Sequence, residues 1–289
     1  MKAMRIHAWN EPPRLADLPE PVRTPGRTLV RMAAATVGHI DRTVWGGHFM
    51  NPPDLPYVPG VEAAGIVIES ETFAPGERVW VRGAGLGTRF DGTWREIIDA
   101  PDAAIGRLPE RVPMSLGSAF FSPCTSAWVA LHEVARVRAG ERVLVSGASG
   151  AVGSLAMQLA RDAGAEAVAW KPDEPGSNAD VLIDTVGGPV LAAALERIEA
   201  GGRAVLVGYT AGNQITLDIA RFLQRDVSLL PLNMFRRDAA GRAAAPELLA
   251  RLADGRLQLQ VTEFPLADAS RAMQWITQRG HRGRAVLVP

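Results

Sequence analysis

The stretch Arg142-Val-Leu-Val-Ser-Gly147-Ala-Ser-Gly150-Ala-Val-Gly153-Ser-Leu-Ala-Met-Gln-Leu-Ala160 decides the fold of this chain. A short aliphatic run leads into a glycine-rich turn, and an apolar segment at helical spacing follows it. Small residues matter in such a turn because a pyrophosphate reaches the backbone N–H groups at a helix start only where no side chain stands in the way. The stretch therefore predicts a strand, a phosphate-binding turn and a helix.

The residues around this turn are typical of a parallel α/β unit. We expect strands at 142–146, 165–170, 180–184, 203–208 and 227–232, and helices at 152–163, 190–199 and 245–253. Gly201 and Gly202 read as a stop signal after the second helix.

Only residues 171–179 separate the second expected strand from the third, and they include two prolines and a glycine. A parallel crossover normally takes a dozen residues or more, commonly with a helix. We therefore expect that one outer strand and its two flanking helices of a full dinucleotide-binding unit are missing. About five parallel strands remain, in the order 2-1-4-5-6.

The first third of the chain reads as short strands at 28–33, 60–68 and 77–82, broken by glycine and proline about every ten residues. This pattern favours a barrel-like β unit. Helical spacing follows at 114–121 and 125–135, with Pro123 as the expected break. The tail is expected to be helical at 266–278, extended at 284–288 and packed on the first domain. The predicted domains are 1–115 with 256–289, and 116–255.

Charge and cysteine content exclude several classes of partner. The 289 residues carry 31 basic and 31 acidic side chains, so neither nucleic acid nor an anionic membrane meets a basic surface. The single cysteine, Cys124, rules out an intramolecular disulfide and a four-cysteine zinc site. The start lacks a signal-peptide core, and no run of about 18 apolar residues occurs. We expect a cytoplasmic protein that binds a small molecule.

Short motifs lie in a fixed order over nearly the whole chain: Val37-Gly-His-Ile-Asp-Arg-Thr43, Leu55-Pro-Tyr-Val-Pro-Gly-Val-Glu-Ala-Ala-Gly65, Pro75-Gly-Glu-Arg-Val79, Gly92-Thr-Trp-Arg-Glu96, Thr125-Ser-Ala-Trp128, Gly147-Ala-Ser-Gly-Ala-Val-Gly153, Asp184-Thr-Val-Gly187 and Gly283-Arg-Ala-Val-Leu-Val288. They resemble the medium-chain dehydrogenase/reductase superfamily, specifically its zinc-independent quinone oxidoreductase and enoyl reductase branch. The resemblance implies an α/β protein with a GroES-like β-barrel domain, a truncated Rossmann domain and an active site in the cleft between them.

The resemblance also implies chemistry without a metal. The zinc branch carries a cysteine and a histidine as ligands, whereas the corresponding positions here are Val37 or Gly38, and Val61. The five histidines show no paired spacing of the metal kind. The family's metal-free reaction is hydride transfer from a reduced nicotinamide to a conjugated carbonyl, such as a quinone or an enone.

For the cofactor, the resemblance points to Thr125, Gly147, Ala148, Ser149, Gly150, Ala151, Val152, Gly153, Lys171, Val186, Gly208 and Tyr209. Thr125 also reads as a helix N-cap. Lys171 stands just past the second strand, where a basic group favours the 2′-phosphate of NADPH, whereas Asp173 and Glu174 favour NADH. Lys171 comes first, so NADPH is expected, with NADH as the alternative. The shortened loop removes a wall of the adenosine pocket, so cofactor binding could be weak or lost.

The candidate catalytic residues are Asp41, His39 and Tyr209. Asp41 either orients a neighbouring backbone turn or lies near the substrate. His39 either donates a proton to an enolate or is a solvated loop residue. Tyr209 follows a strand whose end touches the nicotinamide in family members. The candidate substrate-cleft residues, whose aromatic members could line the barrel core instead, are Trp45, His48, Phe49, Phe90 and Trp94.

Two further functions stay open. The shortened loop favours a redox-silent family member that uses the same cleft for a lyase, isomerase or cyclisation step, with a vestigial nucleotide domain. A non-catalytic binding or assembly protein is the third reading. The resemblance also suggests a homodimer formed through the edge strand at 227–232.

Overall fold

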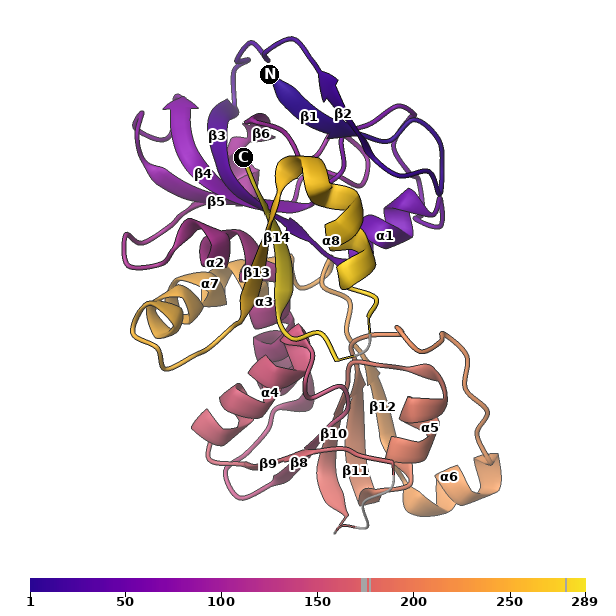
Figure 1. The fold of residues 1–289 in the computed structure, drawn as a ribbon. Helices are drawn as coiled ribbons and strands as arrows, with labels where there is room; N and C mark the ends of the chain where they lie inside the picture. The colour runs from indigo at the N-terminus through magenta and orange to yellow at the C-terminus, as the bar shows by residue number, and fades with distance from the viewer. Residues whose placement is uncertain (173–175, 177, 279) are drawn as a thin grey trace. The chain divides into compact units, whose positions relative to one another are not determined.

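The computed structural model describes residues 1–172, 176, 178–278 and 280–289, which form two compact units. Unit 1 contains Met1–Phe121, Leu252–Asp254 and Gln260–Pro289, and unit 2 contains Ser122–Arg251 and Gly255–Leu259. Figure 1 labels their elements. No helix in the described residues is long and apolar enough to cross a membrane.

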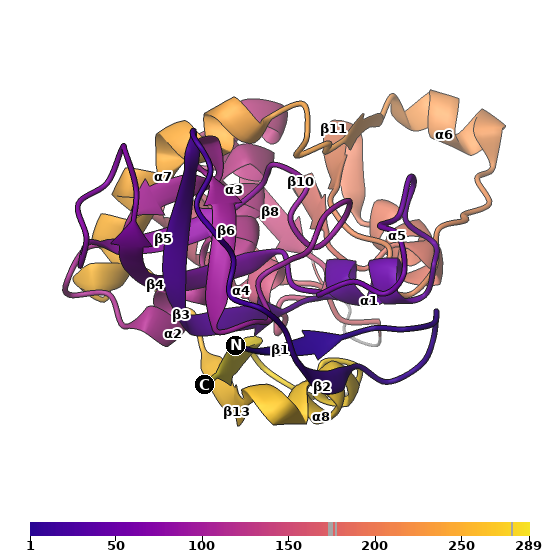
Figure 2. The same cartoon turned by 90° about the horizontal axis from the view of Figure 1, so that it is seen from above.

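Unit 1 is built on one sheet that has seven strands in the described residues, with order β13-β14-β3-β4-β5-β7 and β6 paired to β3. The bounds are β3 Arg27–Val37, β4 Glu62–Glu69, β5 Arg78–Arg82, β6 Ile97–Pro101, β7 Ile105–Arg107, β13 Val261–Pro265 and β14 Arg284–Val288. The long β3 pairs antiparallel with β4, with β6 through its first residues and with β14 through its last. The neighbouring course of β3 and β6 is clear in Figure 2. The predicted return of the tail to the first domain is confirmed.

The remaining elements of unit 1 lie outside this sheet. They are β1 Lys2–Arg5, β2 Arg14–Asp17, α1 His39–Trp45, α2 Met114–Ala119, α8 Ala269–Trp275 and two 3-10 turns, Asp102–Ala104 and Leu266–Asp268. The strands β1 and β2 form a separate antiparallel pair. Helix α8 packs beside β14, and α2 packs on β3 and β4. Buried side chains such as Val30, Ile98 and Leu287 form the core.

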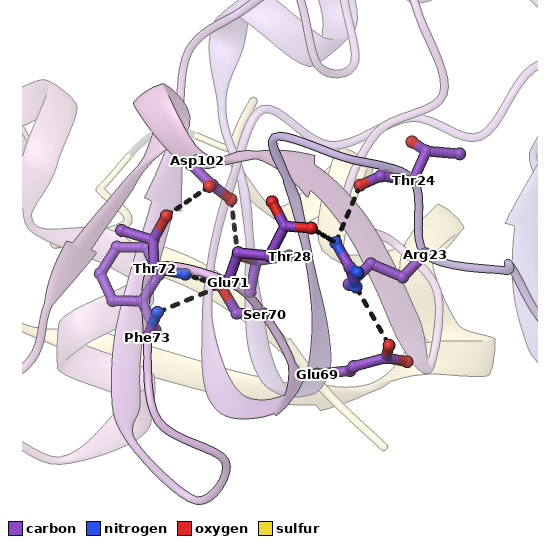
Figure 3. Close-up of polar contacts among 9 residues, drawn as sticks. All are labelled: Arg23, Thr24, Thr28, Glu69, Ser70, Glu71, Thr72, Phe73 and Asp102. Atoms are coloured by element: carbon purple, nitrogen blue, oxygen red, sulfur yellow. Dashed lines mark hydrogen bonds and ion pairs between the residues drawn. The ribbon is translucent and has the colours of Figure 1, made fainter.

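A polar network at the start of β3 joins that strand to the residues that follow β4 and β6 (Figure 3). The Asp102 carboxylate accepts hydrogen bonds from the hydroxyls of Thr28 at 2.7 Å and Thr72 at 2.6 Å. The Ser70 hydroxyl accepts from the backbone N–H groups of Thr72 and Phe73 at 3.0 and 3.1 Å. These bonds satisfy polar groups that the sheet itself leaves unpaired.

Unit 2 is a parallel sheet of five strands in its described residues, with order β12-β11-β10-β8-β9. The bounds are β8 Arg142–Val145, β9 Glu166–Ala169, β10 Ala179–Asp184, β11 Ile198–Leu206 and β12 Ser228–Pro231. Counted in chain order with the outer third strand left out, this is 2-1-4-5-6, as predicted. The truncated α/β fold is therefore confirmed.

Among the helices that follow Phe121, α4, α5 and α6 pack on this sheet, and α4 and α5 are seen beside it in Figure 1. The bounds are α3 Phe121–Val129, a π-helix Ala130–Ala135, α4 Ala151–Asp162, α5 Gly188–Leu195, α6 Ile219–Arg225 and α7 Asp238–Ala253. Helix α7 begins seven residues before the predicted start, with Asp238 in its first turn. A carboxylate there is favoured by the helix dipole.

Two breaks were predicted wrongly. Pro123 lies inside the first turn of α3, where an N–H has no helical partner to lose, and α2 ends at Ala119 instead. Gly201 and Gly202 do not stop a helix but lie within β11. The pairing register of β10 and β11 shifts there, and Gly201 has a φ of 78°. The glycine pair therefore marks a strand irregularity.

Candidate functional site

The glycine-rich turn of unit 2 lies between β8 and α4 and closes tightly. Gly147 has a φ of 61°, and a Cβ there would lie 2.4 Å from the Thr185 hydroxyl oxygen. A Cβ on Gly153 would lie 2.2 Å from the carbonyl oxygen of Gly147. Gly150 is the N-cap of the 12-residue α4. The turn can close in this way only with glycine at Gly147 and Gly153, because a side chain there would collide with neighbouring atoms of the protein.

A buried hydrogen-bond network ties this turn to the end of β10. The Ser146 hydroxyl donates to Asp184 at 2.5 Å and accepts from the Thr185 N–H at 3.0 Å. The Thr185 hydroxyl donates to the Ser146 carbonyl at 2.9 Å, and Gly187 N–H donates to Asp184 at 2.8 Å. Burial raises the pKa of Asp184, partly offset by these bonds. The network fixes the strand ends that carry the turn.

The predicted residues Val186, Gly208 and Tyr209 meet the turn at the same edge. A Cβ on Gly147 would lie 2.8 Å from Val186, and one on Gly187 would lie 2.7 Å from the Cα of Tyr209. The Tyr209 side chain is 65% exposed. The structure therefore brings the glycine turn, Val186, Gly208 and Tyr209 to the carboxyl ends of β8, β10 and β11, the edge where open α/β sheets bind ligands.

Lys171 and Thr125 lie elsewhere in unit 2. Lys171 follows β9 after Trp170, and its side chain is exposed. Thr125 is fully buried inside α3, so its predicted N-cap role is wrong; a Cβ on Gly241 of α7 would touch it. Asp173 and Glu174, the residues that favoured NADH, lie outside the described residues.

Asp41 is the most perturbed acid of unit 1. It sits in the first turn of α1, is 1% exposed, and its Oδ2 accepts from the Gly38 N–H at 2.7 Å. Its Oδ1 is buried without a hydrogen-bond partner in the described part of the chain. Burial raises its pKa to about 7, although the Gly38 bond and the charge of Arg284 oppose this. Asp41 therefore orients a turn, and its raised pKa lets it hold a proton at neutral pH; its place near the substrate stays a prediction.

Sequence reasoning missed the groups around Asp41. Glu62 on β4 is 1% exposed and bonds to Arg284 on β14 at 2.7 Å, with Arg82 at 3.6 Å. The Tyr57 hydroxyl is buried without a described partner, and burial together with the charge of Asp41 raises its pKa. A glutamate within the apolar run 58–68 was the available signal, because a buried charge needs a partner. Asp41, Tyr57 and Glu62 are buried, and Arg82 and Arg284 beside them are half-buried.

The other predicted residues of unit 1 divide between surface and core. His39 keeps part of its surface exposed, but atoms packed around its ring partly desolvate it. This desolvation, helped by the charges of Arg284, His281 and Arg42, lowers its pKa to about 4, so the imidazole is neutral at pH 7. Of the predicted cleft residues, Trp94 is fully buried in the core, and its indole N–H donates a hydrogen bond to the Thr36 carbonyl. Trp45 and Phe49 pack against the small buried cluster that contains Tyr57. Phe90 and His48 are exposed. Of the two placements that the sequence left open for Trp94, the structure shows the barrel core.

Val37, Gly38 and Val61, where the resemblance puts the zinc ligands of the zinc branch, offer no metal-binding side-chain atoms. No group of three or more His, Cys, Asp or Glu side chains within the described ranges is arranged to hold a metal ion.

Known proteins match both units. Residues 24–110 match the alcohol dehydrogenase GroES-like domain, and residues 156–287 match the zinc-binding dehydrogenase family. The quinone oxidoreductase of Homo sapiens is 25% identical over 330 positions, which cover 100% of this chain and 98% of that protein. A mycocerosic acid synthase-like polyketide synthase of Mycobacterium tuberculosis is 24% identical over 299 residues, 91% of this chain and 14% of that protein. The solved quinone oxidoreductase of Pseudomonas syringae has a TM-score of 0.88 at 22% identity, covering 100% of this chain and 99% of that one.

The length of the human alignment agrees with the truncation. Its 330 positions span a chain of 289 residues, so about 41 positions have no residue here. A strand with two helices is of this size.

Proposed function

Because the chain belongs to the zinc-independent quinone oxidoreductase branch of the medium-chain dehydrogenase/reductase superfamily, we propose that it reduces a conjugated carbonyl, a quinone or an enone, with NADPH and without a metal. The observation that carries this proposal is the strand edge of unit 2. There the glycine-rich turn, Val186, Gly208 and Tyr209 lie together on a support of buried hydrogen bonds.

The cofactor fits the residues present. The turn packs closely on its own neighbours at Gly147 and Gly153, and Gly150 is the N-cap of α4, where the first helical N–H groups could bind a pyrophosphate. Lys171, at the end of β9, would hold the 2′-phosphate of NADPH. When bound, the nicotinamide supplies the hydride, and the protein supplies binding and orientation.

Asp41 is the candidate that can hold a proton for the reduced product. Its pKa of about 7 leaves a substantial protonated fraction at neutral pH, whereas His39, with a pKa of about 4, has almost none. Tyr209 stays a candidate through its exposed hydroxyl at the cofactor edge.

Cofactor binding tests the first half of the proposal. NADPH fluorescence should change on titration into the protein, and Lys171→Gln should raise the Kd for NADPH about tenfold while leaving that for NADH unchanged, because only NADPH carries the extra phosphate. Arg161→Gln, which removes an exposed positive charge from α4, is the control and should change neither value. Equal weakening for both cofactors would contradict the assigned role of Lys171.

Turnover tests the second half. Loss of NADPH absorbance with a panel of quinones and enones should be seen for at least one substrate class. Absence of binding at millimolar NADPH would contradict the reductase proposal.

A redox-silent enzyme is the second candidate, and one observation favours it. Strand β9 is the edge of the sheet in the described residues, and only nine residues link it to β10. The adenosine half of a cofactor therefore loses the strand and helices that normally cover it. NADPH binding without turnover across the whole panel would favour this candidate.

We also propose a homodimer through β12. This strand is the other edge of the described sheet, and Leu229 and Leu230 on it are only half-buried. Antiparallel pairing of two such edges would join the sheets of two copies. Light scattering that gives the mass of a single chain would contradict this.

A further inference from the structure

A second concave site opens on unit 2, away from the glycine-rich turn. Its volume is about 920 Å³, at the upper end of the range for small-molecule sites. Arg203 on β11, Leu230 and Pro231 on β12, and the residues that end the π-helix and follow it line this hollow. No residue of the turn contributes to it, so the proposed cofactor site does not explain it.

The lining is strongly basic. Five arginines and two glutamates face the hollow, and they are Arg136, Arg138, Arg203, Arg236, Arg237, Glu133 and Glu141. Glu141 is neutralised by the Arg203 guanidinium, which donates to both of its carboxylate oxygens at 3.0 and 2.8 Å. Four guanidinium groups against the single carboxylate of Glu133 remain.

Those four arginines are not held by side-chain hydrogen bonds, although the charge of Arg138 acts on Glu141 and helps to lower the pKa of that carboxyl. Within the described residues, the side chains of Arg136, Arg138, Arg236 and Arg237 make no hydrogen bond or ion pair. Like charges gathered around one concavity repel each other, and a hollow of this kind concentrates their field. A bound anion would offset this repulsion.

The wall that carries these groups is held in place. Besides Glu141, Arg203 donates to the carbonyl oxygens of Ala135 at 2.5 Å and Arg136 at 3.3 Å, where the π-helix ends. Arg136 itself adopts a left-handed conformation with φ 53° and ψ 54°. This conformation costs free energy for a residue with a Cβ, and the Arg203 bonds help to maintain it.

We propose that this hollow binds a small molecule with two or more phosphoryl groups. A guanidinium presents parallel N–H donors that match phosphate oxygens in pairs, and four such groups suit a ligand with several negative charges rather than a single one. The half-buried Leu230 gives the ligand an apolar surface beside these charges.

Calorimetric titration of the full chain with inorganic tripolyphosphate at low salt tests this. The wild type should bind, and Arg138→Gln/Arg237→Gln should weaken binding at least about tenfold, because it removes two of the four unpaired guanidiniums. The matched control, Arg31→Gln/Arg161→Gln, removes the same charge from exposed positions outside the hollow and should bind as the wild type does. Arg203 is not substituted, because its hydrogen bonds hold the backbone at the end of the π-helix in place. Thermal unfolding should show that both double variants fold.

Three results would overturn the proposal. The first is no heat with the wild type. The second is equal weakening by the control pair, which would make the effect one of net charge. The third is weakening of tripolyphosphate binding by Lys171→Gln, which lies outside the hollow and would put the anion at the proposed cofactor site. If NADPH does not bind at all, the reductase proposal fails while the two double variants still decide this one.

Discussion

Replacing Asp41 with asparagine should stabilise unit 1 relative to the wild type by an amount that grows with pH. Burial raises the pKa of this carboxyl from 3.8 to about 7. Below pH 3.8 the folded and unfolded chains both carry the proton, so ionisation costs nothing. Between pH 3.8 and 7 the unfolded chain loses the proton while the folded chain keeps it, and the folded state is progressively disfavoured. Above pH 7 both are ionised, and the cost of burying the charge is complete.

The size of the effect follows from this shift. About three pKa units correspond to roughly 4 kcal/mol at high pH, and about 2–3 kcal/mol of this should develop between pH 5 and pH 8. Asparagine keeps an oxygen that can accept the 2.7 Å bond from Gly38 but has no charge to bury. Its amide nitrogen takes the place of an unpaired oxygen, which adds a cost that does not vary with pH. The slope, not the absolute difference, is therefore the measured quantity.

Urea unfolding at a series of pH values, followed by tryptophan fluorescence, gives this slope. Five of the seven tryptophans belong to unit 1, so the signal mainly reports that unit. Asp54→Asn is the control, because Asp54 is an exposed carboxylate of the same unit that solvent surrounds in both states. A difference between Asp41→Asn and wild type that is the same at pH 5 and pH 8 would refute the reasoning.

The support of the glycine turn gives two further predictions, both measured by denaturant unfolding of unit 2. Ser146→Ala leaves a buried oxygen of Asp184 without its donor and should cost about 1–3 kcal/mol, whereas Ser149→Ala, at an exposed position, should be near neutral. Gly187→Ala should cost clearly more than Gly201→Ala. Both glycines have positive φ, worth about 1–2 kcal/mol to a residue with a Cβ, but only the first would also push its Cβ to 2.7 Å from neighbouring backbone. Equal costs within either pair would contradict the contacts described here.

The order of the unit 2 sheet could be predicted because it follows from chain length. Nine residues between β9 and β10 cannot hold a strand and two helices, whatever their conformation. The glycine pair at 201–202 was misread because glycine serves both helix ends and strand irregularities, and only pairing with β10 distinguishes the two. Pro123 was misread because proline breaks a helix interior but fits a first turn.

The site could be predicted where it is local in sequence. The glycine turn and Asp41 were found from motifs, but the partners that give them their properties are distant along the chain. Glu62 lies 222 residues from Arg284, with which it pairs, and Ser146 lies 38 residues from Asp184. Single-sequence patterns do not specify such pairings, because they depend on strand register.

The truncation of unit 2 and the intact glycine turn are compatible because the turn is supported from one side. Ser146, at the end of β8, is bonded to Asp184 and Thr185 at the end of β10, and Gly147 closes against Thr185 and Val186. All these contacts lie on the β10 side of β8, whereas the missing elements would stand beyond β9, on the other side. Loss of an outer strand therefore removes cover from the adenosine end of a cofactor without loosening the backbone that would bind its phosphates. A chain of this kind should lose affinity through the adenosine contacts first, so NADPH and its nicotinamide mononucleotide half should bind more nearly equally here than in a full-length relative.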